Sequence, residues 1–94
     1  MNRYIVRIEL HDAKPEDYDV LHQIMAGAQF SRKARCEDGS VYHLPTAEYY
    51  TETMENSDEL LHAIIGAASA ATKLRGGSFE ILLSKLDSLT TFHC

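Results

Sequence analysis

The sequence predicts a single ferredoxin-like α+β domain, and three observations support this. Residues 3–10 alternate between apolar and mostly charged positions, the period of a half-buried strand. Two amphipathic helical segments, residues 16–29 and 57–75, stand apart in the chain. Between them, Asp38 and Gly39 separate two candidate strands and predict a hairpin. The order β-α-β-β-α-β predicts a four-stranded antiparallel sheet with both helices on one face.

The first strand is the strongest element. Its two faces are Tyr4, Val6, Ile8 and Leu10 on one side, and Arg3, Ile5, Arg7 and Glu9 on the other. One face is fully apolar and contains no Gly or Pro, so we expect a strand whose back is packed under helices. In the predicted sheet this strand is central, and the strands lie in the order fourth, first, third, second.

The first helix begins near Pro15, a residue suited to a first helical turn, and ends near Phe30. Strands are then predicted over residues 31–37 and 40–44, joined by a type I′ turn at Asp38-Gly39. Pro45 has no N–H to donate to a strand ladder, so we expect a bulge or kink there, followed by a further strand over residues 47–53.

Asn56 and Glu59 have the spacing of a capping box and predict the start of the second helix. Gly76-Gly77 ends that helix, and residues 78–84 form the last strand. The tail, residues 85–94, carries Leu86, Leu89 and Phe92 and is expected to be an extra strand or a dimer contact.

Composition narrows the function. A chain of 94 residues is one domain, residues 1–94, and its net charge of −5 argues against a protein coated in nucleic acid and against DNA binding. There is no long apolar run or signal peptide, and Cys36 and Cys94 do not suggest a disulfide framework. We therefore expect a cytoplasmic protein that does not bind membranes.

Five of the nine basic residues lie in two short segments: Arg3 and Arg7, then Arg32, Lys33 and Arg35. If the two segments share the sheet, Arg3 and Arg7 can join one parity of Arg32, Lys33 and Arg35 on the open face, with Tyr50 and Tyr42 or His43 beside them. Such a face is a surface for single-stranded RNA. The alternative is a solvated face balanced by glutamates. The sequence contains no phosphate-binding loop motif, and its five histidines do not have the spacing of metal ligands. No cofactor or metal is therefore predicted.

Two histidines are candidates for acid–base chemistry. His11 lies with Glu9 and Asp12 at the end of the first strand. His11 is a candidate base there, and the two carboxylates are candidate Mg²⁺ ligands. The alternative is that Asp12 only orders the turn. His22 lies at the border of the first helix's apolar face, where many histidines serve only in packing.

Three stretches suggest a family: residues 3–7, residues 30–32, and Asp38-Gly39 followed by residues 42–49. The sequence resembles the GhoS family, the antitoxins of type V toxin–antitoxin systems. The resemblance implies a ferredoxin-like endoribonuclease that cuts the messenger RNA of a small membrane toxin. It also implies that His22 occupies the position of a basic residue involved in cleavage, an arginine in the family. Glu9 stands where the family has an Asp.

The leading hypothesis is thus an RNA-binding endoribonuclease that acts as an antitoxin. His22, with His11 second, is the candidate base for the 2′-hydroxyl proton, and the arginines stabilise the charge that develops on phosphorus. The alternative is a non-catalytic ferredoxin-like interaction module that dimerises through a sheet edge or its C-terminal tail.

Overall fold

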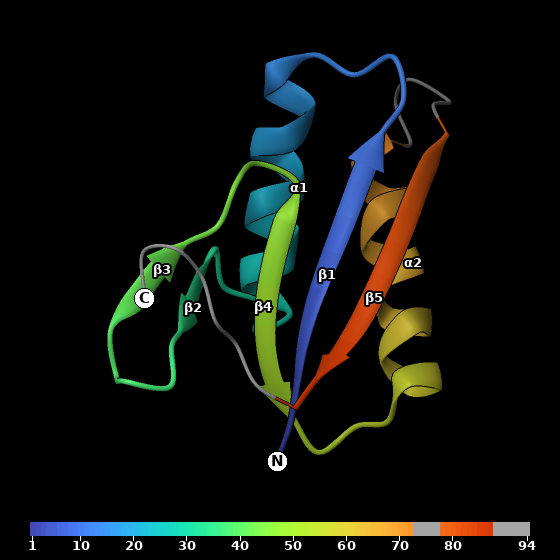
Figure 1. Ribbon diagram of the computed structural model, residues 1–94. Helices are drawn as coiled ribbons and strands as arrows, with labels where there is room; N and C mark the ends of the chain where they lie inside the picture. The colour runs from blue at the N-terminus through green and yellow to red at the C-terminus, as the bar shows by residue number, and fades with distance from the viewer. Residues whose placement is uncertain (73–77, 88–94) are drawn as a thin grey trace.

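The computed structural model describes residues 1–72 and 78–87 (Figure 1). The elements in chain order are β1 (Asn2–Leu10), α1 (Pro15–Gly27), β2 (Lys33–Arg35), β3 (Val41–His43), β4 (Glu48–Thr53), α2 (Ser57–Thr72) and β5 (Phe79–Leu86). The domain is α+β with antiparallel sheets, as predicted.

The main sheet has three strands in the order β4-β1-β5, so the prediction that the first strand is central is confirmed. Both helices lie on one face of it (Figure 1). The core beneath them is built from the predicted apolar face of β1 and from one stripe of each helix: Tyr4, Val6, Ile8, Leu10, Leu21, Met25, Leu60, Ile64, Ala67 and Ala68. Burial of this face is the main contribution to the stability of the fold.

The predicted four-stranded sheet is wrong in one respect: β2 and β3 form a separate two-stranded ribbon. Ser31, just before the ribbon, bridges to the main sheet through paired backbone hydrogen bonds of 2.7 Å with Tyr50. The apolar positions of this segment, Ala34 and Cys36, are both buried. The segment has few apolar side chains, and the ribbon buries these two. In this orientation the ribbon lies against the sheet and does not extend its edge.

The ribbon builds a second, smaller core. Ala34, Leu44 and Tyr50 are buried there, and Ile5, Tyr42 and Leu86 pack against them. Ile5 is the one apolar residue on the charged face of β1, which the sequence analysis took to be open. That face is therefore covered at this end and open only around Arg7 and Glu9.

The hairpin turn differs from the predicted type I′ form. Cys36 N–H donates to the Ser40 carbonyl at 2.8 Å, so three residues, and not two, connect the strands. Gly39 N–H donates to the Cys36 carbonyl at 3.0 Å, and Gly39 is the turn residue with positive φ, at 89°. This is a three-residue loop whose last position requires the left-handed conformation that glycine adopts freely.

The helix starts agree with the sequence analysis. Pro15 is the first residue of α1. At α2, Asn56 N–H donates to the Glu59 carboxylate at 3.1 Å, and Glu59 N–H donates to the Asn56 side chain at 2.9 Å, so the predicted capping box is confirmed. The predicted end of α2 at Gly76-Gly77 lies outside the described residues.

Pro45 begins a turn that leads into β4, where the sequence predicts a bulge or kink. Glu48 N–H donates to the Pro45 carbonyl at 3.1 Å, and Ala47 has a φ of 80°. The Ala47 carbonyl accepts a hydrogen bond of 2.8 Å from the amide of Ile8 in β1. The turn thus joins the start of β4 to the central strand.

β5 runs two residues further than predicted, through Lys85 and Leu86, because Leu86 joins the smaller core. The rest of the predicted tail, apart from Asp87, lies outside the described residues. Cys36 is disulfide-bonded, although the sequence did not suggest a disulfide. Disulfides are rare in a reducing cytoplasm, so this bond does not support the cytoplasmic location, which stays a prediction. Among the described residues, no helix is long and apolar enough to cross a membrane.

Candidate functional site

A cavity of about 410 Å³ lies beside the start of α1, and it contains two of the predicted functional residues. His22 from α1 and Arg32 from the segment before β2 both line it. The rest of the lining is Ala13, Lys14, Pro15, Tyr18, Asp19 and Thr46. The volume falls in the range of small-molecule and nucleotide-sized pockets.

The end of α1 determines where Arg32 lies. Phe30 N–H donates to the Met25 carbonyl at 2.9 Å and Gln29 N–H donates to the Ala26 carbonyl at 3.1 Å, with Gln29 at a φ of 71°. These two bonds form a Schellman motif, in which the chain reverses after a left-handed residue. Phe30 and Met25 are both buried, which fixes the direction in which the chain leaves the helix. Arg32 is thereby returned to the wall that His22 occupies.

The His22 ring is held by its neighbours. Its Nδ1 lies 2.5 Å from the hydroxyl oxygen of Tyr49, a fully buried residue of β4. The His22 and Tyr49 rings meet edge to face with centroids 5.5 Å apart, and the centroid of the Tyr18 ring lies 6.5 Å from that of His22. Within residues 1–72 and 78–87, Nε2 has no hydrogen-bond partner.

Burial lowers the pKa of His22 below its ordinary value of 6.5, and the Arg32 guanidinium lowers it further, against the opposing effect of Asp19. Burial also raises the pKa of Tyr49 far above its ordinary value. Both groups are therefore neutral near pH 7. A neutral imidazole with one free nitrogen is the form of histidine that accepts a proton.

Arg32 is an exposed guanidinium with no ion pair in the part of the chain that the structure describes. Lys14 is a second cation on the same cavity wall, and Asp19 is its one carboxylate. The cavity thus carries a net positive charge beside a neutral histidine. Such a combination can hold a phosphate group next to a base.

The predicted cations of the sheet lie outside this cavity, and the arginines among them each lie beside a carboxylate. Arg3 contacts Glu37 at 2.8 Å, and that carboxylate raises the pKa of Arg3. Arg35 lies 3.3 Å from Glu52. Lys33 and Arg35 line a hollow of about 330 Å³ together with Glu52 and the buried Ala34.

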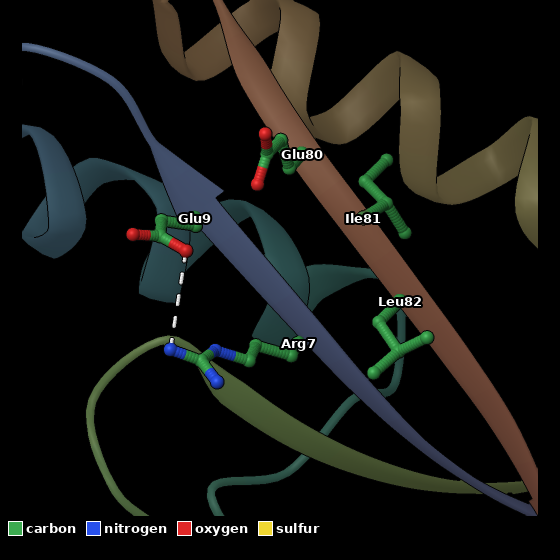
Figure 2. A pocket seen from close by; sticks show the side chains of 5 residues that line it. All are labelled: Arg7, Glu9, Glu80, Ile81 and Leu82. Carbon is green, nitrogen blue, oxygen red and sulfur yellow. Dashed lines mark ion pairs between the residues drawn. The ribbon is translucent and has the colours of Figure 1, made fainter.

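Arg7 lies in a further hollow, of about 470 Å³, on the open face (Figure 2). Its guanidinium is 3.9 Å from Glu9, and Glu80 faces Glu9 across the strands. Two carboxylates and one guanidinium give this hollow a net negative charge, which repels phosphate. Neither Arg3 nor Arg7 is among the residues that line the cavity with His22.

His11, the second candidate base, has both ring nitrogens near polar groups. Nδ1 lies 2.8 Å from the Ser78 hydroxyl, and Nε2 lies 3.7 Å from the Glu80 carboxylate. Within the described residues no group of three or more His, Cys, Asp or Glu side chains is placed to hold a metal ion. Of the aromatic residues expected beside the basic segments, Tyr50 is buried under the ribbon.

Sequence reasoning missed Lys14, Tyr18 and Tyr49 as parts of the site. Tyr49 had a usable signal, since its neighbour Tyr50 was assigned to the open face and alternation along β4 then places Tyr49 on the helix side. Lys14 had none, because its position follows from the loop between β1 and α1.

In comparisons with known proteins, no family model matches the chain, and no curated protein is significantly similar to it.

Proposed function

We propose that the chain is a small RNA-binding endoribonuclease of ferredoxin-like type, resembling the GhoS antitoxins, and that it cleaves RNA in the His22–Arg32 cavity. One observation carries this proposal: a neutral histidine shares a cavity with a guanidinium, and among the described residues Nε2 of the histidine has no hydrogen-bond partner and the guanidinium has no ion pair. This is the pair of groups that cleavage at the 2′-hydroxyl requires.

The proposed reaction requires the tautomer of His22 that has its proton on Nδ1. Nδ1–H then donates to the Tyr49 oxygen, 2.5 Å away, and Nε2 is unprotonated toward the RNA. Nε2 takes the proton of a ribose 2′-hydroxyl as the 2′-oxygen bonds to the adjacent phosphorus. The bond from phosphorus to the 5′-oxygen breaks, and that oxygen takes a proton from water. The products are a 2′,3′-cyclic phosphate and a 5′-hydroxyl, while Arg32 and Lys14 stabilise the negative charge on the phosphoryl oxygens.

The segment from Ser31 to Arg35 supports binding of a strand longer than one nucleotide. Arg32 faces the His22 cavity, while Lys33, which has no ion pair within the described residues, lines a second hollow. A single strand that enters the cavity at one phosphate meets this further cation along the segment. Each neutralised phosphate adds to an affinity that falls with salt.

The antitoxin role rests on the resemblance of residues 3–7, 30–32 and 38–49 to the GhoS family. In this proposal the substrate is the messenger RNA of a small membrane toxin, and the protein acts in the cytoplasm without a cofactor.

The decisive experiment measures cleavage of labelled single-stranded RNA by the wild-type chain and by His22→Ala. For the wild-type chain we expect cleavage that EDTA does not inhibit and products with cyclic-phosphate ends. In His22→Ala the cleavage rate should fall by roughly 10²-fold or more, as it does when a general base is removed. His62→Ala is the matched control, because His62 is an exposed histidine on the other helix. It should cleave at the wild-type rate.

Circular dichroism of both variants separates a lost base from a lost fold. If the wild-type chain neither binds nor cuts RNA at low salt, the proposal is wrong and the interaction module is the better reading. If a folded His22→Ala variant cuts as well as the wild type, the activity exists but its site lies elsewhere.

A further inference from the structure

The outer edge of β5 is an unpaired sheet edge. His11 N–H donates to the Ser78 carbonyl at 2.9 Å, which fixes the hydrogen-bonding phase between β1 and β5. Because this direction alternates along an antiparallel strand, the backbone groups of every second residue of β5 point away from β1. These outward residues are Phe79, Ile81, Leu83 and Lys85.

The opposite edge of the sheet is protected. In β4 the outward backbone groups include those of Tyr50, which exchanges two hydrogen bonds with Ser31, and the amide of Glu48, which donates to Pro45. No residue in the described ranges pairs with the outer edge of β5, which stands at the outside of the sheet (Figure 1). That edge contains no proline, and unprotected edges of this length pair with other strands.

We propose that β5 pairs with β5 of a second copy of this chain, antiparallel about a twofold axis at Leu82, so that two three-stranded sheets become one continuous sheet. This register alone lets all four outward residues of each copy take part: Ile81 faces Leu83 of the second copy, and Phe79 faces Lys85. A shift of the axis to Ile81 or Leu83 leaves one outward residue of each copy without a partner.

The side chains favour the same register. Leu82 is 65% exposed on the open face and would meet Leu82 of the second copy at a position without ladder hydrogen bonds, where side chains approach most closely. Glu80 would face Ser84, so no like charges oppose each other. The strand is thus complementary to itself, which is the requirement for an interface with twofold symmetry.

This dimer is independent of the proposed ribonuclease activity, because β5 contributes no residue to the His22 cavity. The measurement is sedimentation velocity of the full chain over a wide range of protein concentration. We expect a monomer–dimer equilibrium for the wild-type chain.

Two variants with the same change in charge test the register. Leu82→Lys places two ammonium groups at the axis and removes the leucine contact, so we expect the dimer to weaken by about tenfold or more. Ser84→Lys places a lysine opposite Glu80 of the second copy, so we expect a dimer about threefold tighter. Both positions are exposed, and circular dichroism checks that both variants fold.

Amide hydrogen exchange identifies the contact directly. In the dimer, the amides of Ile81 and Leu83 should exchange more slowly at high protein concentration than at low concentration. A wild-type chain that stays monomeric at all concentrations overturns the proposal. So does a dimer that Leu82→Lys leaves unchanged and whose Ile81 and Leu83 amides show no added protection.

Discussion

The open face of the sheet and the cavity beside α1 both carry arginines, but among the described residues the arginine without a carboxylate neighbour is the one in the cavity. Arg3, Arg7 and Arg35 each lie within 4 Å of a carboxylate, at 2.8, 3.9 and 3.3 Å. Arg32 has no such neighbour within the described ranges. In an acidic protein, the spacing of carboxylates decides which cations can bind a phosphate, and a count of basic residues does not.

The sharpest test of this contrast replaces one arginine from each region. Arg32→Ala should lower the cleavage rate at saturating RNA by roughly 10²-fold, because it removes the guanidinium beside the reacting phosphate. Arg35→Ala, the matched control, removes a guanidinium that Glu52 already neutralises, and its rate should stay within about threefold of the wild type. Equal losses in both variants would contradict the distinction between the two regions.

A smaller effect is expected from the open face. The double change Arg3→Ala with Arg7→Ala should weaken RNA binding by several-fold, roughly 1 kcal/mol, and make it less sensitive to salt, because the two charges contribute only to the long-range field. The rate constant at saturating RNA should not change. Titrations of labelled RNA at two salt concentrations measure the affinity. A large fall in the rate constant at saturation would place these arginines at the cleavage site.

The smallest effect concerns acid stability. His22 has a lowered pKa in the folded chain, so below the unfolded value of about 6.5 the unfolded state binds the proton more readily. The stability that this contributes is present above pH 6.5 and falls as the pH drops below it. In His22→Gln, the loss of stability between pH 7 and pH 5 should be smaller than in the wild type, as urea denaturation at each pH would show. A steeper loss in the variant would contradict the lowered pKa.

Much of the fold follows from local patterns. Strict alternation predicted the central strand, and the Asn56 and Glu59 spacing predicted the capping box because both depend on neighbouring residues. The ribbon was not predictable in this way. The segment around Ala34 has too few apolar residues for alternation to show which surface it joins, and its place depends on Ile5 and Leu86, far away in the chain.

The site was predicted in part. His22 and Arg32 were both named from the sequence, but their proximity depends on the left-handed residue Gln29. The sequence does not reveal this left-handed conformation, because the residue that adopts it after a helix is usually glycine or asparagine and not glutamine. The prediction assigned one parity of residues 32–35 to the open face without deciding which. Lys33 and Arg35 line a hollow with Glu52, while Arg32 lines the cavity with His22.

The turn before β4 has a consequence for the rigidity of the cavity. Ala47, next to Thr46 in the cavity wall, holds a φ of 80°, which is strained for a residue with a Cβ. The strain persists because the Ala47 carbonyl is bound to the Ile8 amide at the centre of the sheet. An alanine there costs the folded state about 1 kcal/mol, yet it restricts the backbone more than glycine would. The cavity rim is thereby held in one shape at the expense of thermodynamic stability.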